Sequence, residues 1–168
     1  MIARAPLAAV LLALLATLPA CGLRPVYAGG ANGAIAQGLA AVDVAPIEGR
    51  EGWLVRNALQ HRLEQGGSAA PAQYRLDVVL DDDLESFGVL TDDTIGRERR
   101  TLRARFQLVE MGSGAILVDA TAGSDAGIDV VGSEYATIAA EQTALENLAE
   151  QVADRIVTRL TLTLREQS

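Results

Sequence analysis

Four arginines at odd-numbered positions recur at short intervals along one segment of the chain, residues 95–109. Side chains two residues apart on a β-strand emerge on the same face, so this segment would present a column of guanidinium groups. Guanidinium groups bind phosphates and carboxylates through paired hydrogen bonds, and the chain contains no lysine to share that role. We therefore predict a contact site for lipid phosphates or for an acidic protein surface. This arginine column consists of Arg97, Arg99, Arg103 and Arg105.

The arginine column also has a purely structural interpretation. Pairing across neighbouring strands with Asp77, Asp81 and Asp119 would satisfy the same pattern of charges. The two interpretations are compatible, because a paired guanidinium can still present part of its donor fork to a ligand.

The other reactive side chains predict no catalytic or metal site. His61, the single histidine, lies on a predicted helix face without an evident partner for general-base chemistry. The sequence contains no nucleophile elbow and no glycine-rich phosphate loop. Residues 81–83 are three aspartates, but the apolar residues that follow interrupt the ligand spacing of a calcium loop. We therefore expect a protein that is not an enzyme and that binds neither a metal ion nor another cofactor.

The single cysteine, Cys21, follows a pattern typical of export signals. Arg4 precedes an apolar stretch over residues 5–18, which is too short to span a membrane as a helix. Residues 18–21 are close to the lipobox of bacterial lipoproteins, with Pro19 as an imperfect fit. An ordinary secretory signal, cleaved nearby, is the alternative. We predict cleavage before Cys21, with diacylglycerol on its sulfur and an acyl chain on its amine as a stable membrane anchor.

The net charge and the residue after Cys21 indicate which partners and which membrane to expect. The formal net charge is −8, which disfavours binding to nucleic acid. Gly22 stands where an aspartate would signal retention in the inner membrane of many Gram-negative bacteria. We therefore predict an outer-membrane lipoprotein, anchored by its lipid at the periplasmic face.

The distribution of apolar residues divides the chain into three parts. These are a signal peptide over residues 1–20, a lipidated N-terminus and flexible tether over 21–38, and one α+β domain over 39–165. Within the domain we predict strands at 39–47, 74–81, 95–109 and 115–122, and helices at 49–65 and over about thirty residues after Ser133.

These elements predict a two-layer sandwich in the order β-α-β-β-β-α. Strands with one polar face and helices with one apolar face indicate two helices packed on one face of a mostly antiparallel, four-stranded sheet. The arginine column would then lie on the uncovered face. Residues predicted to face the core include Trp53, Leu59 and Leu63 on the first helix, Leu102, Ala104, Phe106, Leu108 and Ile116 on strands, and Tyr135, Ile138 and Ile156 on the final helix.

Several segments resemble those of a known family, the alphaproteobacterial lipopolysaccharide-assembly lipoproteins called LptE. The segment Cys21-Gly-Leu-Arg-Pro-Val-Tyr27 is similar to the start of the mature proteins in that family. The first helix matches less well at Trp53, where a glutamine is more usual. The remaining similar segments are residues 50–59, 74–78, 97–109 and the final helix from Ser133 onward.

The resemblance implies a function without catalysis. LptE-like lipoproteins act as plug and assembly partner of LptD, the β-barrel that translocates lipopolysaccharide, and help deliver lipopolysaccharide to the outer leaflet. Under this resemblance the arginine column would contact either lipid A phosphates or the barrel wall. An auxiliary lipoprotein of an envelope lipid ABC transporter is the alternative function, and a lipoprotein hydrolase dependent on His61 is a weaker one.

Overall fold

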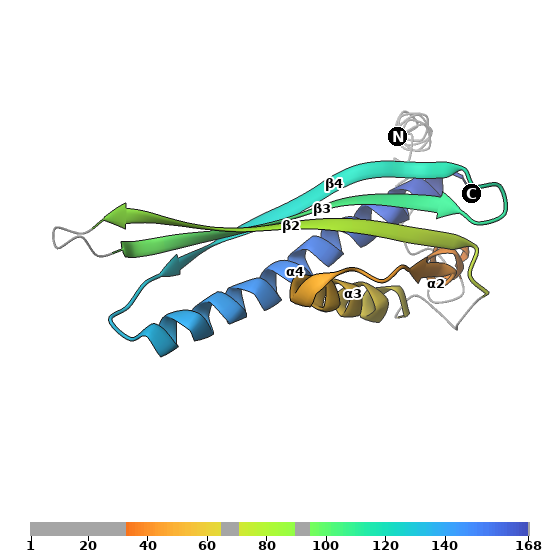
Figure 1. Ribbon diagram of the computed structural model, residues 1–168. Helices are drawn as coiled ribbons and strands as arrows, with labels where there is room; N and C mark the ends of the chain where they lie inside the picture. The colour runs from red at the N-terminus through yellow and green to blue at the C-terminus, as the bar shows by residue number, and fades with distance from the viewer. Residues whose placement is uncertain (1–32, 65–70, 90–94, 168) are drawn as a thin grey trace, which may run out of the picture.

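The computed structural model describes residues 33–64, 71–89 and 95–167. Cys21 and the predicted signal peptide lie outside these residues, so their predictions stay untested by the structure. The described elements are arranged as an elongated sheet with helices along one side (Figure 1). In chain order they are α2 (Ala34–Ala40), β1 (Val42–Val44), α3 (Gly49–Glu64), β2 (Tyr74–Val89), β3 (Ile95–Glu110), β4 (Ile116–Asp129) and α4 (Glu134–Glu166).

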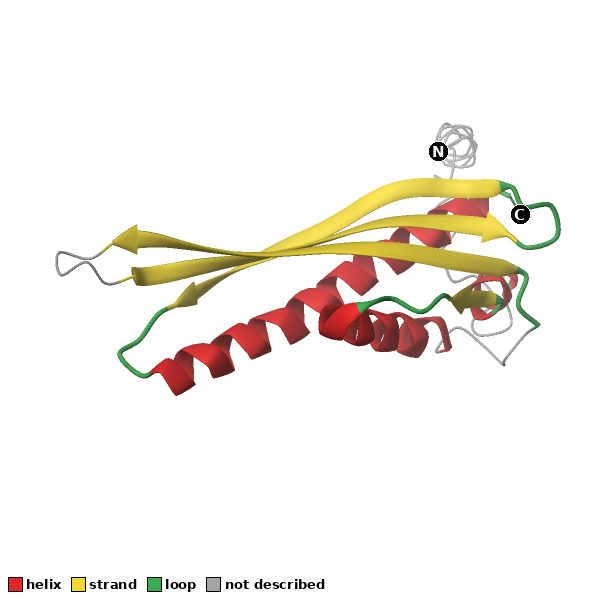
Figure 2. Ribbon diagram, in the orientation of Figure 1, coloured by secondary structure: helices red, strands yellow, loops and turns green. Residues whose placement is uncertain are grey.

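The four strands form one sheet in the order β1-β2-β3-β4. β1 runs parallel to β2, whereas β2, β3 and β4 pair as antiparallel neighbours. Figure 2 shows the helices on the same side of the sheet. The predicted α+β class, with a mostly antiparallel four-stranded sheet, is therefore confirmed.

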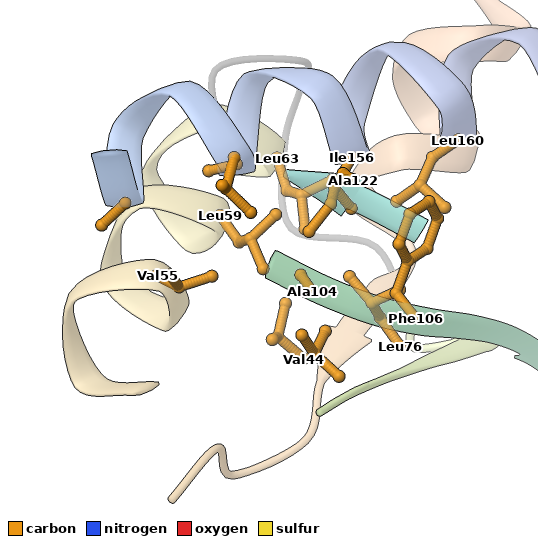
Figure 3. Close-up of a cluster of buried hydrophobic side chains, with 14 of the residues drawn as sticks. Val44, Val55, Leu59, Leu63, Leu76, Ala104, Phe106, Ala122, Ile156 and Leu160 are labelled. Carbon is orange, nitrogen blue, oxygen red and sulfur yellow. The ribbon is translucent and has the colours of Figure 1, made fainter. Parts of the chain in front are cut away.

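The hydrophobic core lies between this sheet and helices α3 and α4. On β3, alternate residues point inward as predicted, and Leu102, Ala104, Phe106 and Leu108 are buried. They meet an apolar stripe on α4 that includes Ile156 and Leu160 (Figure 3). Burying a side chain as large as Phe106 contributes roughly 1.5–3 kcal/mol. The alternating pattern of β3 therefore decides which face of the sheet the helices cover.

A third described helix, α2, occupies residues that the sequence assigned to the flexible tether and the first strand. Ala36 and Leu39 are buried, and Gly38 lies so close to α4 that an added Cβ would be 3.3 Å from Leu164 Cδ1. The absence of a side chain at Gly38 allows this close approach. As a result β1 contains only three residues, rather than the nine predicted for the strand at 39–47.

Three of the core residues predicted on the helices are exposed, each for a local reason. Trp53 on α3 is 64% exposed, because α3 turns Gly52 rather than Trp53 toward the core. An added Cβ at Gly52 would be only 2.6 Å from the carbonyl oxygen of Ile47. Tyr135 and Ile138 are 84% and 44% exposed, since the first turns of α4 extend away from the sheet (Figure 1).

Strand β4 is longer than the sequence predicted and contains an irregularity. It continues to Asp129, beyond the predicted end at residue 122, through a run of small and polar residues with weak strand preference. A register shift at Leu108/Val109 places Ile116 opposite Val109. Partners in register share a face of the sheet, so Ile116 is turned away from the core and is 57% exposed.

Candidate functional site

The candidate site is the outer face of the sheet, which we define as the face opposite the helices. Its residues alternate with the buried residues of β2, β3 and β4. No helix of the described part of the chain covers this face (Figure 2). All four members of the arginine column are exposed there, so the structure brings Arg97, Arg99, Arg103 and Arg105 together on one face of β3.

Three members of the column form ion pairs with aspartates of β4. The distance between Arg97 Nε and Asp129 Oδ1 is 3.1 Å. For Arg105 Nη2 and Asp119 Oδ2 it is 2.9 Å. Ion pairs as exposed as these add little to stability, but they hold the guanidinium groups in place along the strand.

Arg99 makes a looser pair and an aromatic contact. Its Nε atom lies 3.8 Å from Asp125 Oδ2, and its guanidinium carbon lies 5.6 Å from the centre of the Phe87 ring.

Of the three aspartates that the sequence predicted as partners of the column, Asp119 forms an ion pair with Arg105. The sequence missed Asp125 and Asp129 as partners, because they belong to the part of β4 that was not predicted.

The pair between Arg105 and Asp119 carries the clearest electrostatic effect on this face. The side-chain hydrogen bond from Arg105, followed by one from Gln107 at 2.8 Å, lowers the pKa of Asp119 to about 2. The same hydrogen bond to Asp119 raises the pKa of Arg105. Both groups therefore stay charged at neutral pH.

Arg103 differs from the other three arginines. Within the described ranges its side chain has no hydrogen bond and no ion pair. Its neighbour on β4 is Gly123, which offers no carboxylate, and its neighbour on β2 is Asp81. Arg103 borders a depression of 380 Å³ that Asp83 and Glu85 also line. Its guanidinium is thus the one member of the column that the described residues leave open to a ligand.

The outer face as a whole is not a basic patch. The arginine column on β3 lies between acidic residues on both adjoining strands, and these outnumber the arginines. Asp77, a predicted partner of the column, instead accepts a hydrogen bond of 3.0 Å from Arg75 on its own strand. The acidic residues are Asp77, Asp81, Asp83 and Glu85 on β2, and Asp119, Asp125 and Asp129 on β4. The face therefore suits a partner with charges of both signs.

An arginine that the sequence analysis did not single out forms the most buried ion pair described. Arg100 points inward from β3, and Arg100 Nε donates to Asp82 Oδ1 at 2.9 Å. Only 16% of the Arg100 side chain and 17% of the Asp82 side chain are exposed. Arg100 Nη1 also donates to the carbonyl oxygen of Glu141 on α4 at 3.2 Å. The signal was present, because Arg100 has the same parity as the buried Leu102.

The hydrogen bond to Asp82 raises the pKa of Arg100, against the opposing effect of burial. Asp82 lies on the inner face of the sheet, whereas its sequence neighbours Asp81 and Asp83 lie on the outer face.

His61 lies on the exposed side of α3. In the described ranges, no group of three or more His, Cys, Asp or Glu side chains is placed to hold a metal ion.

Within residues 33–64, 71–89 and 95–167, no helix is both long enough and apolar enough to cross a membrane.

Comparisons with known proteins identify relatives of this fold. A family model described as "LptE: Lipopolysaccharide-assembly" matches residues 39–160. The structure resembles a lipoprotein from Caulobacter crescentus CB15 with a TM-score of 0.62 and 26% identity, covering 78% of this chain and 96% of that one. No curated protein matches the sequence.

Two more distant lipoproteins share the fold. Rare lipoprotein B from Shewanella oneidensis has a TM-score of 0.58 at 12% identity, over 75% of this chain and 96% of its own. Lipoprotein B from Nitrosomonas europaea has a TM-score of 0.54 at 10% identity, over 73% of this chain and 86% of its own.

Proposed function

Because the chain belongs to the LptE family of lipopolysaccharide-assembly lipoproteins, whose members are not catalytic, we propose that it is the plug and assembly partner of the LptD barrel. In this role it helps deliver lipopolysaccharide to the outer leaflet of the outer membrane. The acyl groups on Cys21 hold the domain at the periplasmic face of that membrane. The described fold begins at α2, so a segment of about a dozen residues joins the anchor to the domain.

The observation that carries this proposal is the uncovered outer face of the sheet. A long antiparallel sheet with one solvated face presents its side chains at regular spacing to a partner. The face bears ion pairs from Arg97 to Asp129 at one end and from Arg105 to Asp119 toward the other. Mixed charges of this kind specify the orientation of a protein partner more than they add affinity. We infer that the outer face meets the polar wall of the barrel.

Arg103 has a separate part in the proposal. Its guanidinium has no hydrogen bond or ion pair among the described residues, and lipid A phosphates are suitable acceptors for it. Phosphate recognition would therefore depend on Arg103 more than on Arg97, Arg99 or Arg105, whose donors are partly used by aspartates.

The test is charge reversal of the column in cells that express LptD. The Arg103→Glu, Arg105→Glu double variant should copurify less LptD and bind less lipopolysaccharide than the wild type. The matched control is Arg50→Glu, Arg165→Glu, which makes the same charge change at two exposed positions on the helices. Circular dichroism of each variant checks that the fold is retained.

The two readouts separate the two contacts. Loss of LptD with lipopolysaccharide binding intact assigns the column to the barrel wall, and the reverse assigns it to lipid A. If the double variant matches the control in both assays, the column is only structural and this part of the proposal is wrong. Crosslinking from the outer face to an inner-membrane ATPase complex, rather than to LptD, would contradict the proposed partner.

A further inference from the structure

A groove runs between the free edge of β4 and helix α4, on the opposite side of β4 from the arginine column of β3. Its volume is 360 Å³. Phe106, Ala120 and Ala122 supply apolar surface, and Arg155 and Arg159 of α4 form its basic side. The groove therefore combines apolar contacts, positive charge and one edge of a β-sheet.

The backbone of β4 faces this groove at every second residue. β4 is the last strand of the sheet, so only one of its edges is paired. The Val130 amide donates to the Gly96 carbonyl at 3.2 Å, which places the even-numbered residues of β4 in hydrogen-bonded pairs with β3. The odd-numbered residues Thr121, Asp125 and Gly127 consequently point their amide and carbonyl groups away from β3. Arg155 donates to one such carbonyl, that of Gly123.

This edge has only part of the protection that usually prevents strand addition. Proteins protect exposed edges with short strands, proline, charged side chains, β-bulges or a covering helix. β4 has a register shift near its start and aspartates on its outer face, but its edge backbone is open over most of its length. β4 has fourteen residues and contains neither proline nor lysine. Between Ala120 and Gly127 its inward residues are three alanines and a serine, so no large side chain shields the backbone.

The two arginines of the groove keep hydrogen-bond donors for an acidic ligand, although one Arg155 nitrogen already donates to the Gly123 carbonyl. Arg155 and Arg159 lie one turn apart on α4, so their side chains share a helix face. Neither forms an ion pair within the described residues. The nearest acidic residues along α4, Glu150 and Asp154, pair instead with Arg62 of α3.

We infer that this groove binds an extended, acidic segment of another protein, which adds to β4 as a further strand. The outward backbone groups of β4, except the Gly123 carbonyl that accepts from Arg155, would form the hydrogen-bond ladder, as in other cases of strand addition. Carboxylates on the inner face of the added strand would meet Arg155 and Arg159, and the aliphatic parts of the same side chains would cover Ala120 and Ala122. This inference rests on β4 and α4, and it does not depend on the proposed function.

The probe is a fluorescein-labelled eight-residue peptide of alternating valine and glutamate, titrated against the full chain in detergent by fluorescence anisotropy. A valine–lysine peptide is the control ligand. Arg155→Glu with Arg159→Glu should weaken binding of the acidic peptide at least about tenfold, because attraction becomes repulsion. Arg165→Glu, an exposed position near the end of the same helix, should leave binding unchanged.

A backbone variant distinguishes strand addition from simple charge attraction. The Thr121 amide points away from β3, so Thr121→Pro removes one outward donor and leaves the pairing with β3 intact. We expect this variant to lose peptide binding while keeping its circular dichroism spectrum. Hydrogen exchange on the wild type provides a second measurement, in which the peptide should slow the Thr121, Asp125 and Gly127 amides but not those of Ala120 and Ala122.

Three results would overturn the inference. The first is equal binding of the acidic and basic peptides, or no binding of either. The second is full peptide binding by Thr121→Pro together with unchanged exchange at the outward amides. The third is binding of phosphatidylglycerol vesicles that depends on Arg155 and Arg159 in the absence of any peptide binding, which would make the groove a site for anionic headgroups.

Discussion

The ion pair between Arg100 and Asp82 allows the sharpest quantitative prediction. Replacing Arg100 with methionine keeps a flexible, unbranched side chain but shortens it and removes its charge and its hydrogen bonds. Those bonds join Arg100 to Asp82 on β2 and to the Glu141 carbonyl on α4. The substitution therefore leaves a carboxylate on the inner face of the sheet without its partner.

The size of the effect follows from the burial of the pair. Removing one partner of a fully buried pair costs roughly 3–5 kcal/mol, whereas exposed pairs are worth roughly 0–1 kcal/mol. Side-chain exposures of 16% and 17% place Arg100 and Asp82 nearer the buried case. We expect Arg100→Met to lower the free energy of unfolding by about 2–3 kcal/mol.

A double variant tests the reason for this loss. Asp82 lies between Leu80 and Leu84 in the inward series of β2, and its partner in register is Leu102. Asp82→Leu combined with Arg100→Met fills this position with apolar groups and removes the unpaired charge. Apolar replacements of buried pairs are often neutral or stabilising, so the double variant should recover most of the stability lost by Arg100→Met.

The assay is urea unfolding followed by circular dichroism, since Trp53 is largely exposed and would report poorly by fluorescence. Arg105→Met is the matched control, because it breaks an exposed pair on the same strand and should change stability far less. The reasoning is refuted if Arg100→Met and Arg105→Met are equally destabilised. It is also refuted if the double variant is no more stable than Arg100→Met.

Two further predictions concern Asp119 and Gly52. The folded pKa of Asp119, about 2, lies below its usual 3.8, so its contribution to stability is complete above pH 3.8 and is lost as pH falls through about 2. NMR titration should show this pKa rising toward 3.8 in Arg105→Gln, and an unchanged pKa would contradict the assigned cause. Gly52→Ala should destabilise α3 by roughly 1–3 kcal/mol, because the added Cβ would be 2.6 Å from the Ile47 carbonyl oxygen. Helix propensity alone predicts the opposite sign, a gain of about 1 kcal/mol, so a higher melting temperature would show that the loop before α3 moves aside.

The sequence alone determined the elements whose side-chain period is unambiguous. The alternation of Leu102, Ala104, Phe106 and Leu108 predicted both β3 and its buried face, since a strand repeats every two residues. The apolar spacing from Leu145 to Leu160 likewise predicted the long final helix. Because parity along one strand needs no tertiary information, the shared face of the arginine column could also be predicted.

Only the tertiary structure decided which residues meet across elements. Asp125 and Asp129 became partners of the arginine column because β3 holds the weakly strand-forming end of β4 in register. Helix α2 formed in a glycine- and alanine-rich segment because α4 offers it an apolar surface. The groove beside Arg155 and Arg159 exists because α4 lies beside the last strand of the sheet, β4. These features depend on contacts between residues far apart in the chain, which local periodicity does not encode.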